Sequence, residues 1–388
     1  MSDPVGHGTA ASNGEVAPGP SGAAGAELGG AAGAGLSGGV GAGLGGAAGA
    51  GLSGGVGAGL GGAAGAGLSG GVGAGLGGAA GAGLSGGVGA GLSGAAGAWP
   101  SGGVAVVTGG GSGIGLAIAT RLAAEGARVA VADIDAEAAR RAVEGILAGH
   151  PDAREEGVGG ARVAAFQVDV SSLGSVQALA AAVRETFGPV SILVNNAGVA
   201  STGRLDAMTD EDWGWLFGVN FSGMVHGVTA FLPQLRETRG RILNTGSMAG
   251  LSPDAGMGGY GTTKFAVTAY TEVLAAELAE EGIAVTLLAP GPVRTALGSS
   301  SRNRPEGSEG GLVDVDLAAS EGGGLRWISA EEVAEVAVEA LRDGRRYAIT
   351  HPDWVDVVRE RHRSIEAAFA EASRESASQG HTGRIDQE

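Results

Sequence analysis

Residues 103–372 are predicted to form one doubly wound α/β domain around a parallel sheet. Three observations lead to this prediction. Short apolar runs alternate along the chain with helical stretches, which is the order that a parallel sheet covered by helices requires. A glycine-rich turn joins the first apolar run to the first helical stretch, and an acidic residue ends the second run. The segment is long enough for one large domain of this class.

The strands are predicted from short runs of valine, isoleucine, leucine and alanine. An apolar run of four to eight residues between turn-forming residues is typical of a strand that is buried on both faces. The predicted strands are Val104–Thr108, Arg128–Asp133, Val163–Val170, Val190–Asn195, Arg241–Thr245 and Ala284–Leu288.

The helices are predicted from apolar residues spaced three and four apart. Ser329 begins one of them, because a serine followed three residues later by Glu332 forms a capping box. A polar tail, residues 373–388, is expected after the last helix. The predicted helices are Leu116–Glu125, Ala136–Leu147, Leu173–Phe187, Asp210–Leu235, Gly261–Glu281, Ser329–Leu341 and Trp354–Ala372.

A tandem repeat precedes this domain. The 16-residue unit AAGAGLSGGVGAGLGG begins at Ala31, Ala47 and Ala63, and it recurs from Ala79 with one Gly→Ser change. Half of each unit is glycine, so the backbone entropy is high and apolar side chains are few. We predict that residues 1–102 form a low-complexity, disordered arm. Two interpretations are considered. The arm is a surface or assembly tether, or it is the product of expanded GC-rich DNA that is translated in frame, and we favour the second.

The composition excludes several classes of function. The chain has no cysteine, which excludes disulfides and cysteine-based metal sites, and we predict no metal site. A formal charge of −17 argues against nucleic acid or an anionic membrane as a partner. The first basic residue is Arg121, so no positive n-region of a secretory signal is seen, and the repeat is too poor in leucine for a membrane span. We expect a cytoplasmic protein.

The glycine-rich turn is the first candidate site. It reads TGGGSGIG and lies between a predicted strand and a predicted helix. Glycines allow the backbone to approach a pyrophosphate, and the helix start supplies free N–H groups and a positive dipole end. An ordinary loop between strand and helix is the alternative. The candidate cofactor-binding residues are Thr108, Gly109, Ser112, Gly113, Ile114 and Gly115.

Asp133 ends the second predicted strand, 18 residues after Gly115. A carboxylate at this point can accept hydrogen bonds from ribose hydroxyls, and it would repel a 2′-phosphate. Ile134 follows, where an arginine would accommodate that phosphate. These features favour NAD over NADP. In the alternative, an NADP-linked enzyme, Asp133 caps the next helix, although Asp135 could fill that role.

Lys264 is the only lysine in a chain with 23 arginines, and it follows Tyr260 by four residues. On a helix these positions share one face. A free tyrosine ionises near pH ~10, and a neighbouring ammonium favours its phenolate. We therefore predict that Tyr260 is an acid/base with a pKa closer to neutral pH. A chance pair on a solvated helix is the alternative.

These residues resemble the short-chain dehydrogenase/reductase family, in its compact single-domain branch with a Rossmann-like fold. The resemblance covers about Gly103 to Ala370. The glycine turn matches the cofactor loop of the family, and Ser247 lies 13 residues before Tyr260, the usual gap. The other matches are Asp169 and Val170, which contact adenine; Asn195, Asn196, Ala197 and Gly198 after the fourth strand; Asn220 of the catalytic set; and Pro290, Gly291, Val293 and Thr295, which close over the nicotinamide.

The resemblance implies a role for each catalytic residue. Tyr260 exchanges a proton with the substrate, while the nicotinamide gives or takes a hydride at a secondary alcohol or ketone. Lys264 lowers the pKa of Tyr260 and binds the nicotinamide ribose. Ser247 holds the substrate oxygen. Asn220 anchors a water that links Lys264 to solvent.

The substrate pocket is predicted less sharply. Met248–Gly259 would form an apolar wall, because methionine adapts to varied shapes. Trp213, Trp215 and Phe217 could line the same region, but aromatic residues at such spacing more often belong to the core or to a subunit contact. By resemblance, Gly298–Gly324 is a mobile substrate lid, with a disordered insertion as the alternative.

Three hypotheses on function remain open at this point. The leading one is an NAD-dependent alcohol dehydrogenase or ketone reductase with a small, apolar substrate. The second is an NADP-linked ketone reductase. The third is a nucleotide-sensing scaffold with a repeat tether, which the complete set of Asn220, Ser247, Tyr260 and Lys264 argues against. Because members of the family are commonly tetramers, a homo-oligomer, dimer or tetramer, is expected.

Overall fold

The computed structural model describes residues 102–150, 162–304, 312–315 and 326–378, together with Trp99 and ten short segments of the repeat. The chain divides into two units, Met1–Ala95 and Ala96–Glu388. The first unit contains the tandem repeat, and the second contains the predicted α/β domain.

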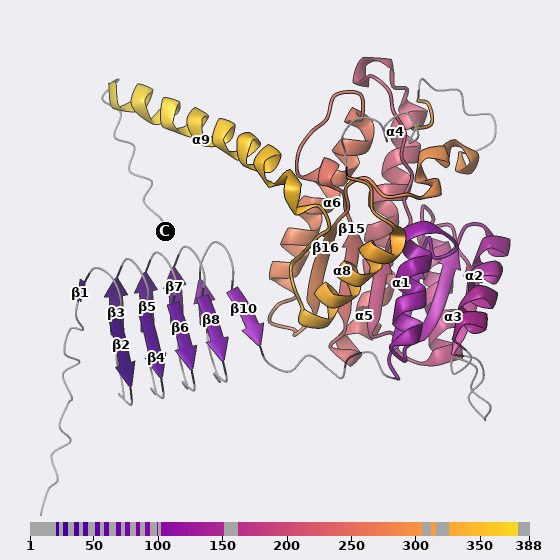
Figure 1. The fold of residues 1–388 in the computed structure, drawn as a ribbon, viewed down its shortest axis with the longest axis horizontal. Helices are drawn as coiled ribbons and strands as arrows, with labels where there is room; N and C mark the ends of the chain where they lie inside the picture. The colour runs from indigo at the N-terminus through magenta and orange to yellow at the C-terminus, as the bar shows by residue number, and fades with distance from the viewer. Residues whose placement is uncertain are drawn as a thin grey trace, which may run out of the picture. The chain divides into compact units, whose positions relative to one another are not determined.

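The described segments of the repeat are short strands, β1 to β10 (Figure 1). They pair in parallel between equivalent positions of successive repeats, for example Leu36 with Leu52 and Leu44 with Leu60. Each repeat thereby contributes one strand to each of two five-stranded sheets. The predicted disorder of the arm stays a prediction. The strands are Ser21–Gly22, Ala26–Gly29, Gly35–Gly38, Ala42–Gly45, Gly51–Gly54, Ala58–Gly61, Gly67–Gly70, Ala74–Gly77, Gly83–Ser85 and Ala90–Ser93.

A seven-stranded parallel sheet forms the centre of the second unit, in the order β13-β12-β11-β14-β15-β16-β17 (Figure 1). The doubly wound α/β fold is therefore confirmed. The sequence analysis did not predict the last strand, β17, because three residues at a sheet edge give too short a pattern. The strands are β11 Val104–Thr108, β12 Arg128–Asp133, β13 Val163–Gln167, β14 Ile192–Asn195, β15 Arg241–Thr245, β16 Ala284–Ala289 and β17 Tyr347–Ile349.

The helices begin and end close to the predicted bounds. One predicted helix, Asp210–Leu235, is two α-helices joined by the π-helical turn η3, Gly218–Ser222. The last helix continues to Ser378, into the predicted polar tail. The helices are α1 Gly113–Ala124, α2 Ala136–Gly149, α3 Leu173–Phe187, α4 Asp210–Phe217, α5 Gly223–Thr238, α6 Gly258–Glu277, α8 Ala330–Asp343 and α9 Val355–Ser378.

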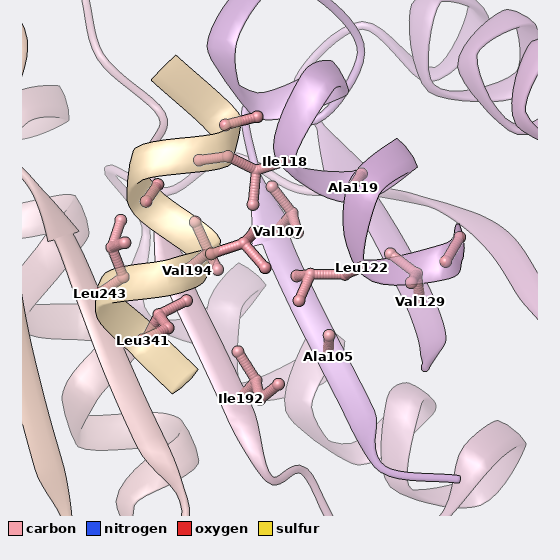
Figure 2. Packing of buried hydrophobic residues seen from close by; sticks show 14 of the residues in the cluster. Ala105, Val107, Ile118, Ala119, Leu122, Val129, Ile192, Val194, Leu243 and Leu341 are labelled. Carbon is pink, nitrogen blue, oxygen red and sulfur yellow. The ribbon is translucent and has the colours of Figure 1, made fainter. Parts of the chain in front are cut away.

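Two apolar layers hold the helices against the sheet. Alternate residues of a strand face opposite layers, so Ala105 and Val107 pack toward α1, α2 and α8, while Val104 and Val106 pack toward α3, α5 and α6. Figure 2 shows the first layer, with Leu122 of α1 beside the central strand. Burial on both faces explains why the strands read as continuous apolar runs.

Local signals fix several helix ends. The predicted capping box is present at α8, where Ser329 accepts from the N–H of Glu332 and the Glu332 carboxylate accepts from the N–H of Ser329. A second capping box, between Thr209 and Asp212, begins α4. The stretch Asp210–Thr238 is long and apolar enough to cross a membrane, but a core helix passes the same test, and both α4 and α5 pack within this domain.

The strand order reverses at the centre of the sheet. Chain order runs outward from β11 to β13 on one side, and from β14 to β17 on the other. The connections leaving the carboxyl ends of β11 and β14 therefore go to opposite faces and leave a crevice between them. This is where the fold positions a binding site.

Candidate active site

A cavity of about 670 Å³ lies at the carboxyl ends of the strands. Most of the predicted site residues line it, from the glycine turn and Asp133 to Ser247, Tyr260 and Lys264. Four predicted residues, Thr108, Gly115, Asn195 and Asn220, are not among the lining residues and lie behind the wall. Among the described residues, no cluster of His, Asp or Glu could hold a metal ion.

The glycine turn has the geometry expected of a phosphate loop. Gly109 and Gly113 adopt φ values of 62° and 53°, which glycine tolerates and other residues rarely adopt. At Gly115 a Cβ atom would lie 2.2 Å from the carbonyl oxygen of Gly109, so only glycine fits. Ser112 is the N-cap of α1, but its side chain makes no capping hydrogen bond. The first N–H groups of α1 thus lack a side-chain partner at the cavity wall.

Thr108 and Asn196 join the glycine turn to the end of β14. The Thr108 hydroxyl accepts hydrogen bonds from the backbone N–H groups of Asn196 and Ala197, at 3.0 and 3.1 Å. The Asn196 side chain donates to the carbonyl oxygens of Thr108 and Gly109, at 3.1 and 3.3 Å. These buried contacts fix the shape of the turn. The role of both residues is therefore to hold the loop, and Asn196 also lines the cavity.

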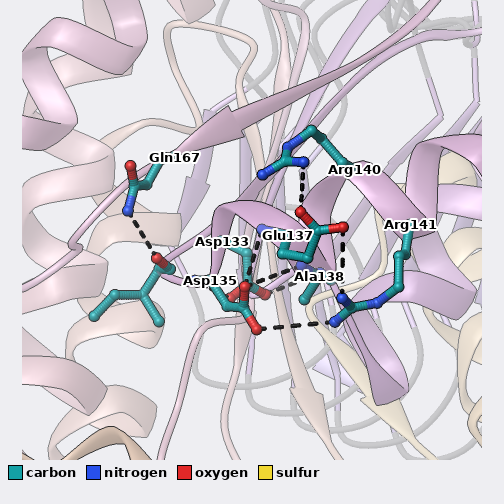
Figure 3. A network of polar contacts seen from close by, with 9 residues as sticks. Asp133, Asp135, Glu137, Ala138, Arg140, Arg141 and Gln167 are labelled. Atoms are coloured by element: carbon teal, nitrogen blue, oxygen red, sulfur yellow. Dashed lines mark hydrogen bonds and ion pairs between the residues drawn. The ribbon is translucent and has the colours of Figure 1, made fainter.

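Asp133 ends β12 and faces the glycine turn. One carboxylate oxygen accepts from the N–H of Gly111 at 2.9 Å, and the other accepts from the N–H of Asp135 at 3.1 Å. The cap of α2 is Asp135, which accepts from Glu137 and Ala138 (Figure 3). The alternative in which Asp133 caps this helix is therefore wrong. Its carboxylate keeps lone pairs for a ligand in the cavity.

Tyr260 and Lys264 lie on one face of α6, as predicted, and both line the cavity. The ammonium of Lys264 lies 5.5 Å from the centroid of the Tyr260 ring and donates to the carbonyl oxygen of Thr245 at 2.9 Å. Ser247 follows β15, and its hydroxyl accepts from the N–H of Ala249 at 3.1 Å and lies near enough to the Tyr260 phenol to lower the pKa of that group. The two segments meet because β15 ends at the crevice beside the first turn of α6.

Burial dominates the titration of this pair. Burial raises the pKa of the Tyr260 phenol, although the hydrogen bond with Ser247 opposes this rise. Burial also lowers the pKa of Lys264 from 10.5 to about 8. For the protein alone, the pKa of Tyr260 therefore shifts away from neutrality and not toward it as predicted, because burial of the phenolate outweighs the hydrogen bond with Ser247.

Asn220 lies in the π-helical turn between α4 and α5. Its side-chain oxygen accepts from the N–H of Val199 at 2.8 Å. Its amide group donates to the Val199 carbonyl at 2.9 Å and to the Thr263 hydroxyl at 3.1 Å. The side chain therefore ties η3 to the loop after β14 and to α6. Its predicted role as a water anchor stays a prediction; π-helical turns are frequent at functional sites.

Gly291 lies in the predicted nicotinamide segment and rests on a histidine that the sequence analysis did not identify. His351 is fully buried, and its Nδ1 accepts from the N–H of Gly291 at 3.1 Å. Its Nε2 therefore has the proton and donates to the carbonyl oxygen of Arg326 at 3.0 Å. The imidazole thus links the predicted nicotinamide segment to the backbone of Arg326, which follows the predicted lid. Only its position directly after a short apolar run could have suggested it.

The apolar wall differs in part from the prediction. Met248 and Met257 line the cavity as expected. Trp213, Trp215 and Phe217 do not; Trp215 packs with Val199, Leu216 and Leu312 in a small core, which is the role that the sequence analysis considered more common for such residues. The aromatic lining comes instead from Trp327 and Trp354, which are distant in the chain and were missed.

Part of the predicted lid is described. Residues 296–303 form a short 3₁₀ segment, η5, several of whose residues line the cavity. Arg304 then forms an ion pair with buried Asp212 and lies 5.2 Å from the centroid of the Trp215 ring. Residues 305–311 and 316–325 lie outside the described residues, so the lid stays a prediction.

The glycine turn, the Asp133 carboxylate and the Ser–Tyr–Lys group lie around one cavity, as a nucleotide-dependent oxidoreductase site requires. A family model described as short chain dehydrogenase matches residues 103–306, more than half of the chain. Oxidoreductase UcpA of Salmonella typhimurium is 35% identical over 256 residues, which are 65% of this chain and 92% of that protein.

Two solved structures show the same similarity. A short chain dehydrogenase/reductase from Burkholderia phymatum in complex with NAD is 37% identical, with a TM-score of 0.62 over 69% of this chain and 95% of that one. An alcohol dehydrogenase from Thermococcus sibiricus complexed with 5-hydroxy-NADP is 27% identical, with a TM-score of 0.52 over 64% and 94% of the two chains. The chain belongs to the short-chain dehydrogenase/reductase family and is an NAD(P)-dependent oxidoreductase acting on CH–OH groups.

Proposed function

We propose that the protein transfers a hydride between NAD(H) and a secondary alcohol or ketone, with Tyr260 as the general acid/base. The observation that supports this proposal is the meeting of the Tyr260 phenol, the Ser247 hydroxyl and the Lys264 ammonium at one wall of the cavity, beside the glycine turn. Three such groups can hold a substrate oxygen and exchange its proton.

The residues at the glycine turn fit a dinucleotide. The first turn of α1 offers N–H groups without a side-chain cap, which suits a pyrophosphate. Asp133 faces the same space and can accept from ribose hydroxyls, and its charge opposes a 2′-phosphate. Arg141, which lines the cavity, lies 3.9 Å from Asp135 and 3.7 Å from Glu137, so these two carboxylates already partly neutralise its charge. These features support NAD over NADP.

When bound, the nicotinamide would accept or donate the hydride. The chain itself manages the proton. In the oxidising direction Tyr260 takes the proton from the alcohol oxygen, and in the reducing direction Tyr260 donates a proton to the carbonyl oxygen. Ser247 positions that oxygen by a hydrogen bond. Lys264, 4% exposed and held by the Thr245 carbonyl, places a positive charge near the Tyr260 ring and would bind the ribose of the nicotinamide when the cofactor is present.

The apolar side chains that line the cavity support an apolar substrate. They include Met248, Met257, Leu297, Trp327 and Trp354. Thioether and aromatic groups contact apolar surface and adapt to its shape. A substrate with a secondary carbinol or carbonyl and an apolar body therefore suits the site best.

The test combines cofactor binding with turnover. The protein is titrated with NADH and with NADPH, and a panel of secondary alcohols and ketones is then followed by nicotinamide absorbance. We expect tighter binding of NADH and turnover of apolar substrates. Tyr260→Phe should bind NADH as the wild type does and lose about 10²–10⁴ in kcat. Substantial turnover by this variant would refute the assignment of Tyr260, and tighter binding of NADPH would refute the assignment of NAD.

A further inference from the structure

The last helix, α9, has an apolar face that nothing in the described chain covers. Every residue from His362 to Ser376 is exposed, including Ile365 at 42% and Phe369 at 72%. Only the start of the helix touches the domain, where Arg361 lies 5.0 Å from the ring centroid of Phe265 on α6. Figure 1 shows α9 leading away from the sheet.

A helix in this position requires a partner for its apolar side. Most helical stability in proteins comes from packing of an apolar face, not from propensity. The residues of this face recur at alternating steps of three and four, which is the spacing of a two-stranded coiled coil. These residues are Val355, Val358, His362, Ile365, Phe369 and Ala372.

Charge argues against a membrane surface as the partner. Helices that lie on anionic membranes are rich in lysine or arginine on the polar face. Residues 355–376 contain four arginines, no lysine and five acidic residues, so their net charge is slightly negative. The partner is more consistent with a protein surface that offers both an apolar stripe and mixed charge.

The charge distribution of α9 is complementary to itself. Residues 355–365 contain Arg359, Arg361 and Arg363 against Asp356 and Glu360, so this first half is net positive, whereas residues 366–376 contain three glutamates against Arg374 and are net negative. Within the helix, Arg359 pairs with Asp356 and Arg363 pairs with Glu360, so pairing with a second copy adds to or replaces these exposed contacts. If two copies of the helix pack antiparallel, the arginine-rich half of each faces the glutamate-rich half of the other. A twofold interface requires this kind of self-complementary patch.

We propose that α9 pairs antiparallel with α9 of a second copy of this chain. In the heptad register, Val358 packs against Phe369 of the second copy, and His362 packs against Ile365 of the second copy. Arg359 and Glu366 occupy the same flanking position of the repeat, so each forms an ion pair with the other residue of the second copy. This pairing buries the exposed stripe without any other partner. It does not depend on the proposed function.

The first test measures the mass of the full-length protein by sedimentation velocity over a dilution series. We expect an assembly of even copy number for the wild type. Phe369→Glu should raise the dissociation constant of this assembly by about 100-fold, because each symmetric pair would then bury two glutamate side chains, one from each copy. Ala367→Glu lies on the opposite, charged face and serves as the matched control, with an expected change of less than about threefold.

The second test is a charge exchange, which probes the antiparallel register. Arg359→Glu and Glu366→Arg should each weaken the assembly several-fold, because like charges then meet. The double variant should restore wild-type assembly. Equal behaviour of Phe369→Glu and the wild type, or no restoration in the double variant, would overturn the proposal. So would a monomeric wild type that sediments with phosphatidylglycerol vesicles.

Discussion

Replacing Lys264 by methionine is expected to change how the stability of the protein depends on pH. The ammonium is 4% exposed, and burial lowers its pKa from 10.5 to about 8. Between these two values the unfolded chain holds a proton that the folded protein has lost. The free energy of unfolding of the wild type should therefore rise with pH in this window.

The size of the effect follows from the folded pKa. At pH 7 both states of the wild type hold the proton, so the contribution is close to zero. At pH 9.5, about 1.5 units above the folded pKa, the contribution is about 2 kcal/mol, at ~1.36 kcal/mol per unit. Methionine does not titrate. Because Lys264 is the only lysine, no other lysine side chain can produce the same rise.

Urea unfolding of both proteins at pH 7 and pH 9.5, followed by far-ultraviolet circular dichroism, provides the measurement. The wild type should gain about 2 kcal/mol relative to Lys264→Met between the two pH values. Tyr260→Phe is the control and should show the same gain as the wild type, because it keeps the lysine. Parallel pH dependences of the wild type and Lys264→Met would refute the assignment of a buried, desolvated ammonium.

Three further predictions concern the site. Lys264→Arg keeps the charge but not its shape, so kcat should fall at least ~10²-fold, and near-normal steady-state kinetics would show that the lone lysine is incidental. Gly115→Ala places a Cβ 2.2 Å from a backbone oxygen and should weaken NADH binding at least ~10-fold by fluorescence titration, whereas Gly145→Ala, in open space on α2, should not. His351→Asn keeps an acceptor for the N–H of Gly291, so it should preserve the affinity for NADH and raise the KM of the substrate. His351→Gln keeps a donor for the carbonyl of Arg326, so it should weaken NADH binding and preserve the KM of the substrate. Equal losses in both variants would contradict separate roles for the two ring nitrogens.

Much of the fold follows from local patterns. The strands bury both faces, so they read as apolar runs, and the helices show the three-and-four spacing of a one-sided core. The glycine turn was identifiable because its chemistry is contained in eight consecutive residues. The strand β17 was not, since its three residues pair only with β16 and owe their conformation to that neighbour.

The sequence by itself determined the α/β alternation, the glycine turn and the shared helical face of Tyr260 and Lys264, because each depends on residues close together in the chain. The tertiary structure alone decided which carboxylate caps α2, which tryptophans line the cavity, and that His351 lies under Gly291. It also decided that the pKa of Tyr260 shifts upward, because desolvation depends on all the segments that pack around the phenol. Spacing along the chain contains no information about that burial.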